Sequence, residues 1–171
     1  MAKEFKRIPV VNFNDNVFRS IGDDWMLVTA GTPEDFNTMT ASWGTLGILW
    51  NLPVAISFIR PHRFTFGFME RSEHYTLCFL DEGCREILQF CGSRSGRDTD
   101  KVRETGLTPL TTEQGNIYFE QSRLVIECKK LYSDWIREEQ FVISNLIGRN
   151  YKKKDFHKFY IGEIMSCLIS S

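Results

Sequence analysis

Strand-like stretches dominate the chain, and the connections between them lack the repeated helical length that a parallel sheet requires. Apolar, β-branched and aromatic runs predict strands at residues 25–30, 36–43, 53–59, 75–80, 107–110, 117–120, 123–135 and 159–169. The run 123–135 is long enough to bend across the edge of a barrel. The pattern therefore predicts a mainly β (α+β) fold, an antiparallel barrel with a few peripheral helices.

Helices are expected around this barrel. Apolar residues within 84–91 recur at the spacing of one helix face, with Asp81 before them as an N-cap and Gly92 after them as a C-cap. A second short helix is expected over 138–147, ending at Gly148. Residues 63–71 fit both a strand and a helix, because their phenylalanines alternate and also share a helix face.

Length and charge limit the function classes. The 171 residues suffice for one domain, expected to span 1–171. Lys and Arg total 21 against 22 Asp and Glu, so the chain lacks the basic footprint of a nucleic-acid-binding protein. No apolar run reaches the roughly 20 residues of a membrane span, and the first ten residues do not read as a secretory signal. We therefore expect a cytoplasmic protein with neither nucleic acid nor membrane as partner.

Several catalytic signatures are absent from the sequence. It contains no P-loop and no G-x-G-x-x-G turn, and the segment 92–96 (GSRSG) places Arg94 where a hydrolase elbow has serine. The three histidines share no metal-ligand spacing with one another or with the cysteines, so no metal site is expected. The five cysteines are odd in number and form no C-x-x-C, which favours reduced core thiols.

Two polar clusters stand out in this apolar chain. The first, residues 37–43 (NTMTASW), combines hydroxyl and small side chains on one expected strand, so a flat ligand can lie close to the backbone. An ordinary strand rich in threonine explains the same segment equally well. The second, residues 60–65 (RPHRFT), places two arginines and a threonine at the end of a strand, as a phosphate monoester requires. Its alternative is a solvated basic turn.

Two further hydrophilic segments have simpler readings. The loop 93–101 offers more phosphate donors, although such a segment is more often just exposed. The basic run 152–154 is expected to be a solvated hairpin.

The order of these clusters resembles the flavin reductase-like family of FMN-binding split barrels, nearest to its flavoredoxin-type branch. The resemblance rests on N-x-M-T-x-S-W (37–43), W-N-x-P (50–53), R-P-x-R-x-T (60–65), C-G-S-R-S-G-R-D-x-D-K (91–101) and F-Y-I-G-E-I (159–164). It covers about residues 20–168 and favours a helix that starts near Arg63.

The resemblance implies a cofactor and the residues that bind it. In similar proteins the first cluster lies along the flavin and ribityl chain, the second lies by the phosphate, and the loop closes over the cofactor. The FMN-binding residues implied here are Asn37, Thr38, Met39, Thr40, Ala41, Ser42, Trp43, Arg60, Pro61, Arg63, Thr65, Ser95, Gly96, Arg97 and Lys101. A homodimer with FMN near its interface is also implied.

The activity implied is that of an oxidoreductase. NAD(P)H would give hydride to the bound flavin, which would pass electrons to free flavin, ferric iron or a redox protein, and no residue of the chain is needed as a dedicated acid or base. The alternative is an FMN-binding carrier or sensor that does not turn over. An activity like that of pyridoxamine-phosphate oxidase and a purely structural dimer also remain open.

Overall fold

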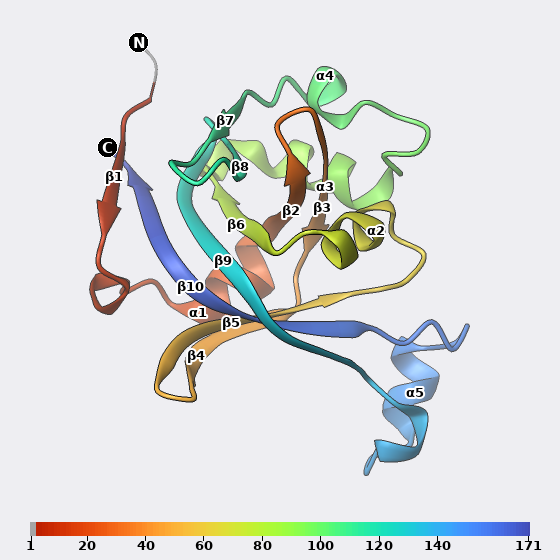
Figure 1. The fold of residues 1–171 in the computed structure, drawn as a ribbon. Helices are drawn as coiled ribbons and strands as arrows, with labels where there is room; N and C mark the ends of the chain where they lie inside the picture. The colour runs from red at the N-terminus through yellow and green to blue at the C-terminus, as the bar shows by residue number, and fades with distance from the viewer. Residues whose placement is uncertain (1–2) are drawn as a thin grey trace.

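The computed structural model describes residues 3–171, and a curved antiparallel sheet runs through it (Figure 1). Every strand pair in this sheet is antiparallel. Its strands are β1 (Phe5–Ile8), β2 (Met26–Thr32), β3 (Asp35–Ala41), β4 (Gly44–Leu49), β5 (Leu52–Ile59), β6 (His74–Leu80), β9 (Ser122–Trp135) and β10 (Lys158–Ser170). A separate hairpin joins β7 (Pro109–Thr111) to β8 (Ile117–Phe119).

The order of the strands brings the two edges of the sheet together. The sheet runs β3-β2-β6-β9-β10-β5-β4, with β1 paired to β10, so β3 and β4 are its opposite edges. These two strands are nonetheless consecutive in the chain and are joined by Ser42 and Trp43 alone. The sheet must therefore curl until its edges meet at this connection. Because β3 and β4 do not pair, the barrel is split there, and we call the place the seam.

Helices cover both faces of the sheet near β3 and pack into two different core clusters. α2 (Phe64–Arg71) packs against β2 and β3, and α3 (Arg85–Ser93) packs against the same two strands. Their inward residues, such as Phe68, Met69 and Leu88, are buried. α4 (Lys101–Thr105) follows α3, and Figure 1 shows all three on one side of the molecule. This arrangement encloses β3, which carries the first polar cluster.

The antiparallel barrel predicted from the sequence is confirmed, and each predicted strand is present. Two strands were missed. β1 is short and polar, so its sequence carries little signal. β4 contains Gly44 and Gly47, which read as a turn, yet it forms a hairpin with β5 through Trp50 and Asn51. Both of those residues have positive φ, 53° and 58°, as the tight turns that match strand twist require.

The helix predictions were correct in part. The ambiguous segment 63–71 is α2, as the resemblance favours. The predicted helix over 84–91 is α3, but it follows a 3-10 turn (Glu82–Cys84) and continues through Gly92, so that residue does not cap it. The Asp81 side chain likewise makes no capping hydrogen bond. Lys101, placed in a loop from the sequence, begins α4.

The predicted helix over 138–147 was wrong. The segment holds a 3-10 turn (Glu138–Gln140), and α5 (Asn145–Asn150) begins only later and contains Gly148. The β-branched pair Val142-Ile143 lies between them, where helix propensity is low. The connection from β9 to β10 projects from the barrel as an arm (residues 136–157) that carries α5 (Figure 1).

Two further observations bear on the expectations from composition. All five cysteines are free thiols, as predicted. Among residues 3–171, no helix is long and apolar enough to cross a membrane.

Candidate functional site

The free edge of β3 is the scaffold of the site. Among residues 3–171, this strand pairs with β2 alone, so main-chain groups along its other edge have no strand partner. One of these groups, the carbonyl oxygen of Thr38, accepts a hydrogen bond from Lys101 Nζ at 2.7 Å. The remaining edge leads to the seam, where main-chain donors and acceptors face open space rather than another strand. Such an edge can bind the rim of a flat heterocycle.

A cavity of about 160 Å³ opens at the seam; we call it the seam cavity. The end of β3 and the connection that follows it form one wall, and β5, the turn after β5 and the end of the arm contribute the rest. Trp43, 43% exposed, lies beside the ring of His157, with 5.0 Å between the ring centroids. The walls combine aromatic and apolar side chains with two hydroxyl and two guanidinium side chains, and they consist of Met39, Thr40, Ala41, Ser42, Trp43, Phe58, Arg60, Arg63 and His157.

A second cavity of about 200 Å³ lies where α2 begins; we call it the anion pocket. Its lining includes basic and hydroxyl side chains but no carboxylate: His62, Arg63, Phe64, Thr65, Gly92, Ser93, Arg94, Ser95, Gly96 and Lys101. The first N–H groups of α2 have no partner within the helix and add a partial positive charge. This combination of guanidinium, ammonium, hydroxyl and helix N-terminus is what a phosphate monoester requires.

A groove of about 450 Å³ connects the two; we call it the α3 groove. It shares Thr40, Ser42 and Arg63 with the seam cavity, and Arg63, Gly92 and Ser93 with the anion pocket. Trp25, Leu88 and Gln89 complete its lining. Arg63 borders all three spaces, so they lie side by side, with aromatic side chains at one end and basic side chains at the other.

Arg63 and Lys101 are held in place by the same segment of α3. Arg63 donates to the carbonyl oxygens of Gly92 at 3.0 Å and Cys91 at 3.3 Å, and Lys101 Nζ donates to the Cys91 carbonyl at 3.0 Å. Burial lowers the pKa of Lys101 to about 8, and the positive charge of Arg63 acts in the same direction. A phosphate would relieve both effects, because an anion favours the charged ammonium.

Asn37 supports the anion pocket from behind. Its amide Nδ2 donates to the hydroxyl oxygen of Thr65 at 2.7 Å, which fixes that threonine in the first turn of α2. Gly96 makes this arrangement possible, because a Cβ at this position would lie 2.1 Å from Asn37 Oδ1. The two polar clusters of the sequence thus meet the hydrophilic loop at one point.

Several predicted residues lie apart from these cavities or play a different part. Arg60 lines the seam cavity rather than the anion pocket, and its guanidinium is paired with Asp155 at 2.6 Å. Arg97 donates to the His62 carbonyl, and its guanidinium lies 5.2 Å from the centre of the Phe64 ring. Four predicted residues line none of the three spaces: Asn37, Thr38, Pro61 and Arg97. Their direct contact with a cofactor stays a prediction.

His157 and Phe58 were missed by sequence reasoning. His157 is buried, and its Nδ1 shares a hydrogen bond of 2.8 Å with the hydroxyl of Tyr151. Burial lowers the pKa of its imidazole to about 4, with Arg60 as the second cause, so the ring is neutral at pH 7. The sequence placed this histidine just before the last strand, but it was weighed only as a metal ligand.

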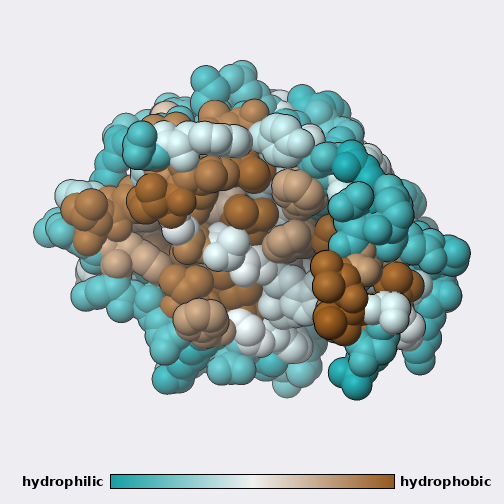
Figure 2. Space-filling view, turned by 90° about the horizontal axis from the view of Figure 1, so that it is seen from below, coloured by the Kyte–Doolittle hydropathy of each residue, from teal (hydrophilic) through white to brown (hydrophobic). Residues whose placement is uncertain are grey.

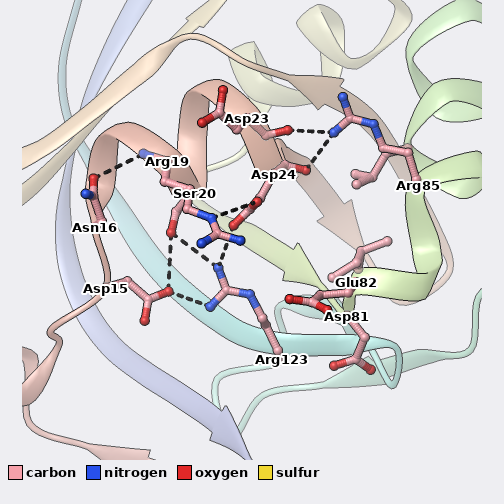
Figure 3. A pocket seen from close by; sticks show the side chains of 12 residues that line it. Asp15, Asn16, Arg19, Ser20, Asp23, Asp24, Asp81, Glu82, Arg85 and Arg123 are labelled. Carbon is pink, nitrogen blue, oxygen red and sulfur yellow. Dashed lines mark hydrogen bonds and ion pairs between the residues drawn. The ribbon is translucent and has the colours of Figure 1, made fainter.

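Another cavity, of about 770 Å³, lies elsewhere (Figure 3). Its arginines are already engaged by neighbouring acidic residues and main-chain carbonyls. Arg123 pairs with Asp15 and lies 3.4 Å from the carboxylate of Asp24, and Arg85 donates to the carbonyl oxygens of Asp23 and Asp24. This cavity has neither the free main-chain edge nor the excess of basic groups found at the seam.

The flavin reductase like domain matches this chain over residues 18–171. The chain belongs to the flavin reductase-like family. Solved structures agree with the split-barrel fold of that family. No curated protein matches the chain significantly.

Three solved structures illustrate the likeness. The FMN-binding domain of a flavin reductases-like enzyme from Shewanella baltica has a TM-score of 0.71 at 14% identity, over 99% of this chain and 78% of that one. Flavoredoxin of Desulfovibrio vulgaris has a TM-score of 0.65 at 20% identity, and the match covers 85% of this chain and 68% of that one. An FMN-binding protein from Thermus thermophilus, with bound 1-cyclohex-2-enone, has a TM-score of 0.65 at 20% identity, and the match covers 93% of this chain and 73% of that one. At these identities the likeness establishes the fold alone.

Proposed function

We propose that this member of the flavin reductase-like family binds FMN at the seam and is an oxidoreductase that takes hydride from NAD(P)H. One observation carries the proposal: a cavity with aromatic side chains, beside a free strand edge, shares Arg63 with a basic pocket lined by no carboxylate. A flat ring linked to a phosphate monoester has this same division into two chemical ends. The names of related structures, which include FMN-binding proteins and a flavoredoxin, support the same ligand.

The residues present fit FMN. Lys101 offers a test, because its ammonium has three N–H groups and two of them reach carbonyl oxygens, which leaves one for a ligand. Arg63, Ser93 and Ser95 supply further donors in the anion pocket. At the other end, main-chain groups of residues 40–42 would hold the polar rim of the ring, and Trp43 would cover it.

When bound, FMN would supply the hydride and electron chemistry, and the chain binds, orients and shields it. Phe58 and Met39 keep the seam cavity apolar, which limits the access of water to the ring. His157 presents a neutral imidazole to the same cavity, so it adds no competing positive charge near the ring. Arg60, neutralised by Asp155, likewise leaves the net charge at the basic end.

An absorbance spectrum tests the proposal directly. The purified protein, loaded with FMN, should show flavin bands that bleach when NADH or NADPH is added without oxygen. Repeated turnover with free flavin, ferric iron or an added redox protein would then identify the acceptor. Reduction that stops after one equivalent would identify a carrier or sensor instead. A protein that takes up no flavin would contradict the proposal altogether.

We also propose that a second copy of the chain covers the face shown in Figure 2, where apolar side chains gather. Exposed hydrophobic residues occur on the β4–β5 hairpin, on the second half of β9 and on the arm. Ile48 is 74% exposed and Val142 is 95% exposed. Contiguous apolar surface of this kind marks interaction sites. Because His157 and Trp43 join the arm to the seam cavity, a copy bound here would lie close to the proposed cofactor.

A further inference from the structure

Trp25 has a strained backbone at the rim of the α3 groove. Its φ of 69° and ψ of 169° lie in a region that bulky residues rarely adopt. A widened π turn (Ser20–Asp24) comes directly before it and sets the position from which the chain enters β2. Strained residues and π turns both concentrate at functional sites. This combination indicates that the indole ring of Trp25 has a functional role.

Two contacts fix the indole. Its Nε1 donates to the carbonyl oxygen of Gly22 at 3.2 Å. The guanidinium of Arg85 lies 3.4 Å from the ring centre, and Arg85 in turn donates to the Asp23 carbonyl at 2.6 Å. The ring is therefore a rigid, half-buried plate in the wall of the α3 groove rather than a loose surface side chain.

The outer part of the groove has its own chemistry. Of the residues that line the groove, Trp25, Leu88 and Gln89 border neither the seam cavity nor the anion pocket. They provide an aromatic face, an aliphatic side chain and an exposed amide. An amide can pair with the N6 and N7 edge of adenine through two hydrogen bonds, and an aromatic plate stacks on the base. The guanidinium of Arg85 covers one face of that plate and does not line the groove, so a base would stack on the other face.

We infer that Trp25 and Gln89 form a subsite for the adenosine half of a dinucleotide whose other half reaches the seam cavity. The inference rests on the proposed function, because the shared residues Thr40 and Ser42 connect the subsite to the proposed flavin ring. Adenosine can come from two sources, the nicotinamide donor or FAD, and we assign it to the donor. The exposed amide of Gln89 would then form hydrogen bonds with the adenine base while the nicotinamide approaches the flavin.

The test compares donors with and without adenosine. We would prepare the FMN-loaded wild type, Trp25→Ala and Gln89→Leu, with Glu86→Gln as a matched control, since Glu86 is exposed on the same helix but lines none of the three cavities. The KM for NADH should rise roughly five- to hundredfold in Trp25→Ala. In Gln89→Leu it should rise about two- to tenfold. The KM for reduced nicotinamide mononucleotide, which lacks adenosine, should stay unchanged in both variants.

Each other outcome also decides the matter. Weaker binding of FAD at unchanged FMN and NADH constants would support the subsite with FAD as its source. Equal changes for both donors, or none, would overturn the subsite. Calorimetric titration of the FMN-loaded protein with AMP is independent of turnover: binding that Trp25→Ala abolishes supports the subsite even if no donor reduces the flavin. Failure of reduction in the wild type would count against the proposed function alone. Circular dichroism verifies that Trp25→Ala folds, and Gln89→Leu changes only an exposed side chain.

Discussion

The ammonium nitrogen of Lys101 lies 2.7 Å from the main-chain carbonyl oxygen of Thr38. This contact joins the first residue of α4 to the unpaired edge of β3 and passes beneath the anion pocket. A buried amino group is thus held against a strand edge by main-chain acceptors, with no carboxylate beside it among the residues that line the pocket. A phosphate bound in the anion pocket would supply the negative charge that these main-chain acceptors lack.

The first prediction concerns the pH dependence of FMN binding. The pKa of Lys101, lowered to about 8 by burial, rises when a phosphate binds beside it, so binding above pH 8 takes up a proton. FMN affinity should therefore fall by up to about tenfold for each pH unit above 8. Fluorescence titration between pH 7 and 9.5 measures this. Riboflavin and the variant Lys101→Met should show no such slope, and a flat FMN profile in the wild type would contradict the assignment.

The second prediction separates phosphate binding from structural support at Arg63. Arg63→Ala removes a charge-assisted contact typically worth about 1.5 to 3 kcal/mol. FMN affinity should fall roughly ten- to a hundredfold, whereas riboflavin affinity should change little. Arg71→Ala, at the far end of the same helix, is the matched control because Arg71 is exposed and pairs with Asp35. Equal losses for FMN and riboflavin would mean that Arg63 supports the fold instead.

The third prediction is a loss of stability in mild acid caused by His157. Its folded-state pKa of about 4 lies below the ordinary value of 6.5, so the unfolded chain binds the proton more readily. The contribution to stability is complete above pH 6.5 and is lost as the pH falls toward 4, by up to about 3 kcal/mol. Urea denaturation at pH 7 and pH 5 measures the change. His157→Gln should be less sensitive to pH, and identical slopes would refute this cause.

The fourth prediction concerns the second copy. An aspartate at Ile48 or Val142 would carry charge into the proposed interface, so the protein should become monomeric. Light scattering coupled to size-exclusion chromatography measures the mass. Val11→Asp is the control, because Val11 is 91% exposed but lies in the 3-10 turn near the N-terminus. A wild-type protein that is already monomeric at micromolar concentration would contradict the proposed dimer.

The sequence predicts those features of the fold that depend on neighbouring residues better than those that depend on contacts between distant segments. Strand identity is a local property, whereas the segment 63–71 stays ambiguous from its own residues and only the family resemblance favours the helix that the structure has. β4 was missed because two glycines hide its alternation, and only pairing with β5 makes it a strand. The arm was misread because its β-branched residues lie on a surface that no core specifies.

The site shows the same limit more sharply. The clusters at 37–43 and 60–65 can be recognised from their residue types. In the structure the first lies mostly on β3 and the second leads into α2. Arg60 and Arg63 look equivalent in the sequence, yet Asp155 binds one of them and leaves the other to the anion pocket. His157 enters the cavity from the end of the arm, more than a hundred residues after β3. No sequence spacing predicts that contact, because it forms only when the barrel closes.

The fifth prediction tests the close approach of the loop 93–101 to β3. A methyl group added at Gly96 would lie 2.1 Å from Asn37 Oδ1 and 2.9 Å from Phe64 Cδ1, so the Asn37 amide must move. Its hydrogen bond to Thr65 would then be lost, and with it the position of a hydroxyl in the anion pocket. Gly96→Ala should therefore weaken FMN binding about tenfold and lower stability by about 1 to 3 kcal/mol.

A double mutant identifies Asn37 as the cause. Asn37→Ala removes the obstructing amide, so adding Gly96→Ala to it should cost far less than Gly96→Ala costs in the wild type. Gly67→Ala is the matched control, because a Cβ there meets nothing within 4 Å. Thermal melts and flavin titrations of the four variants and the wild type complete the cycle. Strict additivity would show that the loop tolerates the methyl group by moving as a whole, in which case Asn37 does not couple β3 to the phosphate end of the site.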